Sequence, residues 1–144
     1  MRVSTTMNSS ISPSDAVYVA ETNSRGRGVF AGRNIKPGDV IEVCPVLVLD
    51  GAAAEGHLDM TGLYDYYFAW GEHEEAIAIA LGYGSLYNHS YTANADHIFD
   101  YTEEVIRIIA CRPIRQGEEI TINYGGRPDC RDPVWFTVHE GETP

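Results

Sequence analysis

The chain has 144 residues, which is enough for one domain with a hydrophobic core of its own. Its net charge of −11 argues against a protein that binds nucleic-acid phosphates across its surface. The same charge suits a basic protein partner, although an acidic surface also serves solubility. No apolar run reaches about 18 residues, so no membrane span is expected.

The cysteines indicate a reducing compartment. Cys44, Cys111 and Cys130 are odd in number, widely spaced and form no Cys-x-x-Cys pair. This pattern disfavours a disulfide framework and a zinc cluster, and we expect no metal site. Free thiols are typical of an intracellular protein, cytoplasmic or nuclear depending on the organism.

The first residues differ in composition from the rest. Residues 1–14 are polar and rich in Ser and Thr, without the apolar core of a secretion signal. We expect a flexible leader over residues 1–14 and a single domain over residues 15–144.

The first half of the domain predicts short strands. Fourteen glycines and seven prolines, many of them in turn sequences, favour a fold with little helix. In chain order we expect strands at residues 16–20, 29–31, 40–43 and 46–49, the last two separated by Pro45. Residues 51–62 form a connector that could contain one helical turn.

The second half predicts two hairpins. Residues 66–70 pair with 76–81, and residues 96–101 pair with 105–110. A short helical turn is expected at residues 83–87, and a strand-like run at 119–125 that ends in a Tyr. Two similar sequences, at residues 35–41 and 114–120, each consist of a turn that leads into a strand. Because the pattern occurs only twice, it indicates that the same type of turn recurs, and it does not indicate a solenoid repeat.

Three short motifs carry chemical information. Residues 26–28 are Gly-Arg-Gly, and residues 88–90 are Asn-His-Ser with Asn94 close behind. The predicted strand that begins at residue 119 ends in Tyr124, which a Gly pair follows. Each motif alone is weak, because Gly-x-Gly and Asn-His usually form turns, and a Tyr at a strand end usually packs in the core.

Together, in this order and at this spacing, the motifs resemble the SET domain of protein lysine methyltransferases, over about residues 17–135. The resemblance implies a mostly β fold, the SET-domain β-clip of short antiparallel sheets with a C-terminal pseudoknot. It also implies that S-adenosylmethionine supplies a methyl group for a lysine ε-amine in a Lys-rich protein or peptide. No Gly-x-Gly-x-x-Gly follows a strand, which disfavours a Rossmann-type methyltransferase.

The resemblance assigns roles to individual residues. Tyr124 would be the catalytic residue, orienting the amine, while Tyr87 and His97 would belong to the substrate channel. We expect the aromatic residues of 66–70 in the core of their hairpin instead of the channel. The cofactor-binding residues implied by the resemblance are Gly26, Arg27, Gly28, Asn88, His89 and, as an aromatic lid, Trp135.

Some positions depart from the family pattern. Ala93 replaces a usual Pro, and His97 stands where many members have Phe or Tyr. The insert before the Asn-His motif is short, so a second subunit could complete the substrate groove and a homodimer is plausible. Two alternatives stay open: a catalytically inactive SET-fold module that binds a basic peptide or senses S-adenosylmethionine, and methylation of a small-molecule or non-lysine amine.

Overall fold

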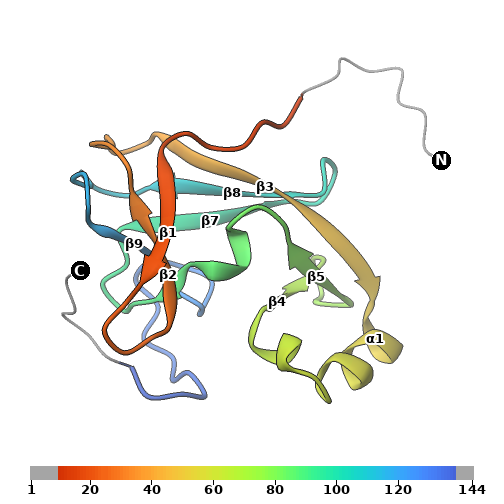
Figure 1. Cartoon of the computed structure of the whole chain (residues 1–144). Helices are drawn as coiled ribbons and strands as arrows, with labels where there is room; N and C mark the ends of the chain where they lie inside the picture. Colours follow the sequence, from red (N-terminus) through yellow and green to blue (C-terminus); the bar gives the residue numbers. More distant parts are fainter. Residues whose placement is uncertain (1–9, 139–144) are drawn as a thin grey trace.

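The computed structural model describes residues 10–138, and the regular structure in this part of the chain is mostly β-strand, with little helix (Figure 1). The strands of its first half are β1 (Val17–Glu21), β2 (Arg27–Ala31), β3 (Val40–Asp50), β4 (Tyr67–Trp70) and β5 (Ala76–Ala80). Those of its second half are β6 (Asn88–His89), β7 (Ala95–Asp100), β8 (Val105–Ala110) and β9 (Glu119–Ile122). The helical segments are α1 (Gly51–Leu58) and the 3₁₀ turns η1 (Gly62–Asp65) and η2 (Gly84–Leu86).

The strands form two sheets. One has the order β1-β2-β9-β6 and the other the order β4-β5-β3-β8-β7. All pairs are antiparallel except β6 with β9, which run parallel and align Asn88 with Thr121 and His89 with Ile122. This parallel pair brings the Asn-His motif beside the C-terminal strand, as the predicted pseudoknot requires. The predicted fold class is confirmed.

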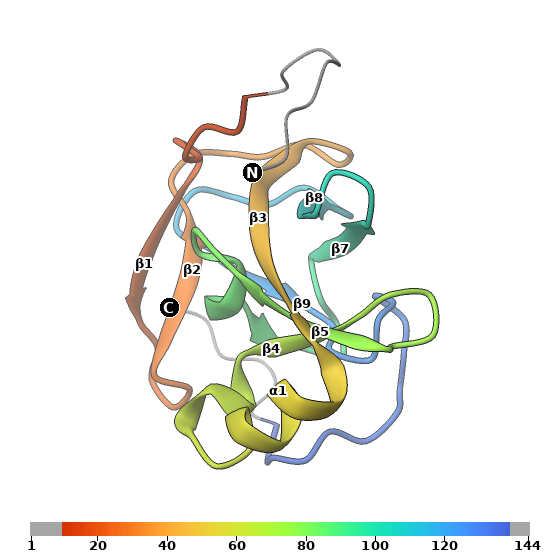
Figure 2. The same ribbon diagram turned by 90° about the vertical axis from the view of Figure 1, so that its right-hand side faces the viewer.

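Both predicted hairpins, β4–β5 and β7–β8, are present, and so is the helical turn before the Asn-His motif. The predicted break at Pro45 is wrong, because β3 is one continuous strand (Figure 2). Residues 40–45 of β3 pair with β8 and residues 46–50 pair with β5. Pro45 lies where the strand changes partner, so its missing N–H removes no ladder bond from the β5 pairing. The connector after β3 contains more helix than expected, because three consecutive alanines favour α1.

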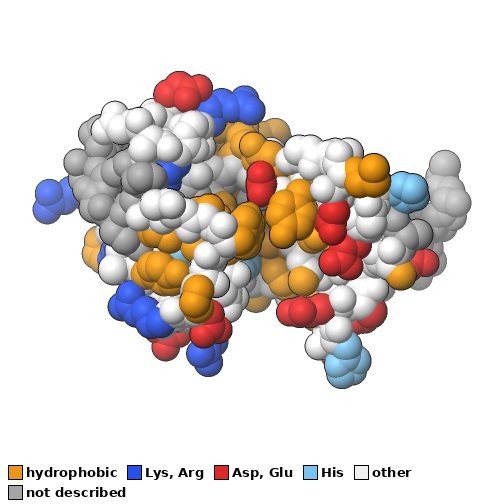
Figure 3. All heavy atoms as spheres, turned by 90° about the horizontal axis from the view of Figure 1, so that it is seen from below, with side chains coloured by type: hydrophobic (Ala, Val, Ile, Leu, Met, Phe, Trp, Pro, Cys, Tyr) orange, Lys and Arg blue, Asp and Glu red, His pale blue; other side chains and the backbone are white. Residues whose placement is uncertain are grey.

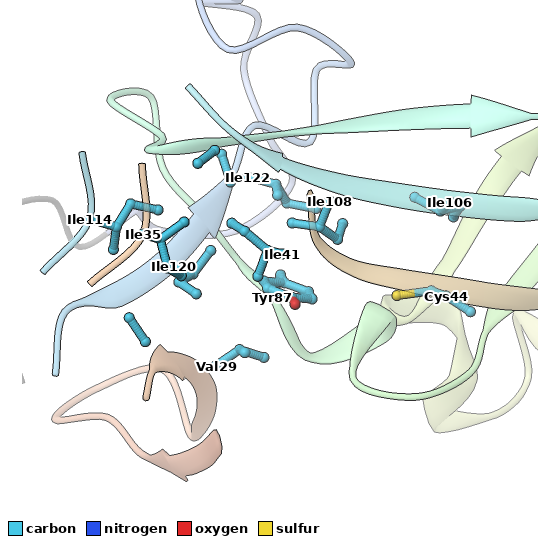
Figure 4. Close-up of a cluster of buried hydrophobic side chains, with 14 of the residues drawn as sticks. Val29, Ile35, Ile41, Cys44, Tyr87, Ile106, Ile108, Ile114, Ile120 and Ile122 are labelled. Carbon is cyan, nitrogen blue, oxygen red and sulfur yellow. The ribbon is translucent and has the colours of Figure 1, made fainter. Parts of the chain in front are cut away.

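The hydrophobic core lies between the sheets. Ile106 and Ile108 of β8 and Ile120 and Ile122 of β9 are fully buried. Tyr87 lies among these aliphatic side chains with its ring enclosed (Figure 4). The ring of this predicted channel residue is therefore a core element, and its surroundings fix the residue in place.

The two similar turn sequences face each other. The N–H of Ile35 donates to the carbonyl of Ile114 at 2.8 Å, and the N–H of Ile114 donates back at 2.9 Å. Each turn has a glycine with positive φ, 86° at Gly38 and 88° at Gly117. The two similar turns thus make one symmetric contact, which joins the segment before β3 to the segment before β9.

The predicted leader is only partly described. Residues 1–9 lie outside the described part of the chain, while Ser14 donates its hydroxyl to the carbonyl of Ile41 at 2.6 Å. Within residues 10–138 all three cysteines are free thiols, and no helix is long and apolar enough to cross a membrane.

Candidate active site

Tyr124 is held at both ends by the segment that contains the Asn-His motif. Its backbone N–H donates to Nδ1 of His89 at 3.0 Å, and its hydroxyl donates to the carbonyl of Tyr87 at 2.8 Å. Burial raises the pKa of Tyr124 to about 12. At neutral pH the residue is therefore an uncharged phenol whose oxygen lone pairs remain available as acceptors.

The side chain of Asn123 fixes the turn that follows Tyr124 by hydrogen bonds. This buried amide donates to the carbonyl of Cys130 at 2.7 Å and accepts the N–H of Gly125 at 2.9 Å. A side chain at residue 125 would collide with Cys130, so glycine is required there for packing. The sequence Asn-Tyr-Gly-Gly therefore places Tyr124 in a defined position at the end of β9.

A cavity of about 320 Å³ opens beside the Tyr124 side chain. On the face seen in Figure 3, hydrophobic side chains surround a central hollow and acidic side chains gather on one side of it. Asp65 and Glu74 supply carboxylates to the cavity lining. An aromatic wall with acidic groups is suited to a cationic or amine-bearing ligand. The aromatic residues of the lining are Tyr64, Tyr66, Tyr67, Phe68, Phe99, Tyr87, Tyr124 and Trp135.

The expectation that the 66–70 aromatic residues pack in the hairpin core is wrong for Tyr66 and Tyr67, whereas Phe68 packs against the core and also lines the cavity. Tyr66, Tyr67 and Phe68 line the cavity, while Trp70 is buried against Phe99 and Tyr101. Tyr67, Phe68 and Ala69 are consecutive residues of β4 and all line the cavity, so the alternation of side chains along the strand does not decide which residues reach it.

His97 lies on β7 in the cavity lining and is only 7% exposed. Its ring packs against Phe68 and Phe99 at centroid distances of 5.9 and 5.5 Å. Nδ1 has no hydrogen-bond partner among residues 10–138 and lies 4.0 Å from a carboxylate oxygen of Asp96. Burial lowers the pKa of His97, more than the Asp96 charge raises it, so the imidazole is neutral at neutral pH.

A polar cluster connects the Gly-Arg-Gly loop to the Asn-His motif. The Asn88 amide donates to Glu119 at 2.8 Å and to the carbonyl of Arg27 at 3.2 Å. Arg25 forms an ion pair with the other oxygen of Glu119 and donates to the carbonyl of His89 at 3.2 Å. A Cβ at Gly28 would stand 2.6 Å from Glu119 and 2.9 Å from Asn88, so only glycine fits.

The C-terminal aromatic pair, Trp135 and Phe136, lies between the polar cluster and the cavity. Trp135 stacks on Tyr124 with ring centroids 6.1 Å apart, and its indole N–H donates to Asp65 at 3.2 Å. Phe136 packs edge-on against His89 and Tyr124. Both rings are exposed, Trp135 at 58%, which leaves apolar surface for a ligand.

The structure brings most of the predicted site residues together. Tyr87, His97, Tyr124 and Trp135 share the cavity. Gly28 and Asn88 lie in the polar cluster, and His89 connects it to Tyr124. Arg27 contributes its backbone carbonyl, while its side chain and Gly26 are exposed.

Sequence reasoning did not identify Arg25, Glu119 and Glu42, the last of which accepts a hydrogen bond from the Tyr87 hydroxyl at 2.7 Å. The available signal was a charged residue inside an apolar strand, since Glu42 and Glu119 both lie in such strands and are buried. Within the described residues, no group of three His, Cys, Asp or Glu side chains is placed to hold a metal ion.

Comparison with known proteins agrees with this geometry. The profile of the SET domain matches residues 26–125. A Schizosaccharomyces pombe protein named "Histone-lysine N-methyltransferase, H3 lysine-37 specific" is 34% identical over 118 residues, which are 82% of this chain and 75% of that protein.

Solved structures agree as well. The crystal structure of a candidate histone methyltransferase from Plasmodium falciparum is 29% identical, covers 80% of this chain and 96% of its own, and has a TM-score of 0.61. A humanised mutant of Chaetomium thermophilum Polycomb Repressive Complex 2 is similar in fold, with a TM-score of 0.67 at 22% identity over 78% of this chain and 15% of that one. The chain therefore belongs to the SET-domain family of protein-lysine methyltransferases.

Proposed function

We propose that the chain transfers a methyl group from S-adenosylmethionine to the ε-amine of a lysine inside the aromatic cavity, with Tyr124 as the catalytic residue. The observation that carries this proposal is the Tyr124 hydroxyl, which is protonated, anchored on the Tyr87 carbonyl and part of the cavity lining. The hydroxyl oxygen can accept a hydrogen bond from the amine and hold its lone pair in line for attack.

The target amine must first lose its proton. A free lysine has a pKa of about 10.4, and burial against aromatic walls disfavours its charged form. The proton leaves to solvent before attack. No side-chain base is therefore needed, and Tyr124, itself protonated, does not act as one. His97 lies in the lining as a neutral imidazole and adds no positive charge that would repel an incoming ammonium.

The polar cluster and the aromatic pair fit the cofactor. S-adenosylmethionine supplies a methyl group on a positively charged sulfur. An uncharged amine can attack this methyl carbon directly, and the sulfur leaves as a neutral thioether. Both N–H groups of Asn88 are used by Glu119 and the Arg27 carbonyl, so its side-chain oxygen and the second lone pair of that carbonyl offer acceptors for the ammonium of the amino-acid end. The exposed faces of Trp135 and Phe136 offer a stacking surface for its adenine. Gly26, Gly28 and His89 would shape the backbone around this pocket.

We propose a Lys-rich protein segment as the substrate. The net charge of −11 and the two carboxylates of the cavity lining favour a basic partner. The S. pombe relative is named for histone H3 lysine-37, so basic histone tails are the first substrates to test. An intracellular enzyme, a homodimer and the absence of nucleic-acid binding remain predictions. The relative is an enzyme, which favours catalysis over an inactive binding module.

The test is turnover with labelled cofactor and a panel of basic proteins that includes histone H3. Tyr124→Phe should lower kcat on the order of 100-fold, because the amine loses its orienting contact, while cofactor affinity changes less than threefold. Tyr18→Phe is the matched control, since this exposed hydroxyl lies on β1, outside the cavity lining. Unchanged kcat in Tyr124→Phe would refute the catalytic assignment.

Cofactor binding is tested separately by calorimetric titration with S-adenosylmethionine and S-adenosylhomocysteine. Saturable one-to-one binding that Asn88→Ala weakens would support the assigned pocket. No binding to well-folded protein would refute it.

A further inference from the structure

A buried carboxylate lies behind the cavity, outside its lining. Glu42 on β3 is 6% exposed, and within residues 10–138 it has no ion-pair partner. A buried carboxylate is costly unless hydrogen bonds satisfy it. A strand that only had to pack would carry an apolar residue here, so the position of this carboxylate calls for a physical reason.

A β-bulge turns Glu42 inward. The register between β3 and β8 shifts between Val40 and Glu42, so Ile41 is the extra residue. In a regular strand the residue after the buried Ile41 would point away from the core. The bulge instead places Glu42 on the same side as Cys44 and Val46, both of which are buried. Bulges re-aim side chains in this way next to functional sites.

The carboxylate holds the turn before the Asn-His motif at two points. One oxygen accepts the hydroxyl of Tyr87 at 2.7 Å, and the other accepts the backbone N–H of Tyr83 at 3.0 Å. Gly82 makes this approach possible: its φ is +62°, and a Cβ there would stand 2.5 Å from the second oxygen. Hydrogen bonds to a charged acceptor are about twice as strong as neutral ones.

This contact leads directly to the catalytic residue. The ring of Tyr87 is fixed in the core, and its backbone carbonyl accepts the hydroxyl of Tyr124 at 2.8 Å. Tyr87 therefore donates its side-chain hydroxyl to Glu42 and accepts the Tyr124 hydroxyl at its backbone carbonyl. Tyr87 remains a phenol that donates to Glu42, because burial and the Glu42 charge both raise its pKa.

We propose that Glu42 is a positioning residue for methyl transfer: it fixes Tyr87 so that the Tyr87 carbonyl orients the hydroxyl of Tyr124. This inference rests on the proposed catalytic role of Tyr124. Glu42 contacts neither substrate nor cofactor, so its loss changes the direction of the Tyr124 hydroxyl and leaves both binding sites in place.

The first test compares Glu42→Ala, Glu42→Gln and Tyr87→Phe in the full chain. Glu42→Ala and Tyr87→Phe should lower kcat about tenfold, with the S-adenosylmethionine KM and the S-adenosylhomocysteine Kd within twofold of the parent. Glu42→Gln has the same shape but keeps only one acceptor oxygen and no charge, so it should recover part of the rate. Asp39→Ala is the matched control, because it too removes a carboxylate that accepts a backbone N–H, that of Lys36 at 3.1 Å, and should leave kcat unchanged.

The second test is non-additivity. If Glu42 acts through Tyr124, adding Tyr87→Phe to Tyr124→Phe should lower kcat less than twofold further. A merely structural role predicts that the two losses multiply, or that kcat follows the folded fraction measured by thermal melting, and either result overturns the inference. If Glu42→Ala does not fold, Glu42→Gln and Tyr87→Phe carry the test.

The two proposals fail differently. Normal turnover in Tyr124→Phe removes the catalytic role of Tyr124, and the Glu42 inference with it. A large loss in Tyr124→Phe together with normal kcat in Tyr87→Phe overturns the Glu42 inference alone.

Discussion

Gly28→Ala tests whether the polar cluster is packed as tightly as the structure indicates. The new Cβ would stand 2.6 Å from Glu119 and 2.9 Å from Asn88, whereas ordinary contacts are 3.4–4 Å. Neither side chain can move freely, because Arg25 holds one oxygen of Glu119 and Asn88 holds the other. The substitution must therefore break the 2.8 Å bond between Asn88 and Glu119 or displace β2.

The magnitude follows from these two routes. Overpacking costs about 1–3 kcal/mol, and losing a hydrogen bond to a charged group costs about 1.5–3 kcal/mol. Because moving Glu119 relieves the overpacking cost and incurs the hydrogen-bond cost instead, the two do not add, and we expect the free energy of unfolding to fall by about 1–3 kcal/mol. For a chain of this size, that lowers the Tm by roughly 3–12 °C.

The assay is urea unfolding followed by circular dichroism, with Gly62→Ala as the control. Gly62 has open space at its Cβ position and no positive φ, so its change should stay within about 0.5 kcal/mol. Combining Gly28→Ala with Asn88→Ala should recover at least about 1 kcal/mol, since the clash partner is shortened. Equal unfolding free energies for Gly28→Ala and Gly62→Ala would refute the packing argument.

Three further predictions concern pH and the aromatic lid. Turnover should rise from pH 7 toward about pH 10 as the target lysine loses its proton, with no second ionisation from Tyr124, whose pKa is about 12; an initial-rate pH profile that falls before pH 10 in stable protein would contradict this. The folded-state pKa of His97 lies below its unfolded value of about 6.5, so its contribution to stability is complete above that pH and is lost as pH falls below it. His97→Gln should flatten this fall, by at most about 1.4 kcal/mol per pH unit in denaturation curves between pH 7 and 5, and an unchanged slope would exclude the effect. Trp135→Ala should weaken S-adenosylhomocysteine binding about three- to tenfold in calorimetry while Trp135→Phe retains it, and equal affinities would remove Trp135 from the binding surface.

Hairpins and motif residues could be predicted from the sequence because their signals are local. Alternating apolar residues on either side of a turn predict β4–β5 and β7–β8. The order of the three motifs made Tyr124 and Asn88 candidate site residues, although neither motif alone is specific. The position of Pro45 was misjudged because a strand that changes partner has the same local sequence as two strands.

The supporting residues could not be predicted because their partners lie far away along the chain. Arg25 and Glu119 are 94 residues apart, and Glu42 and Tyr87 are 45 apart. Nothing in the local sequence of Glu42 indicates the bulge that turns it inward. The aromatic residues Tyr66 and Phe68 had a clear hairpin signal, but periodicity does not tell which side of a strand lines a cavity.

The position of β9 between β2 and β6 affects how the enzyme folds during its synthesis. The strand next to Tyr124 pairs with segments translated long before it, so loop closure must precede the gain from these contacts. During translation, β1–β2 and both hairpins can form while residues 119–124 are still inside the ribosome. Until those residues emerge, the first sheet lacks the inner strand that joins β2 to β6, and Tyr124 cannot reach the carbonyl of Tyr87. Nascent chains, and chains terminated before residue 119, should therefore have no methyl-transfer activity, because catalysis requires β9 to pair with β2 and β6.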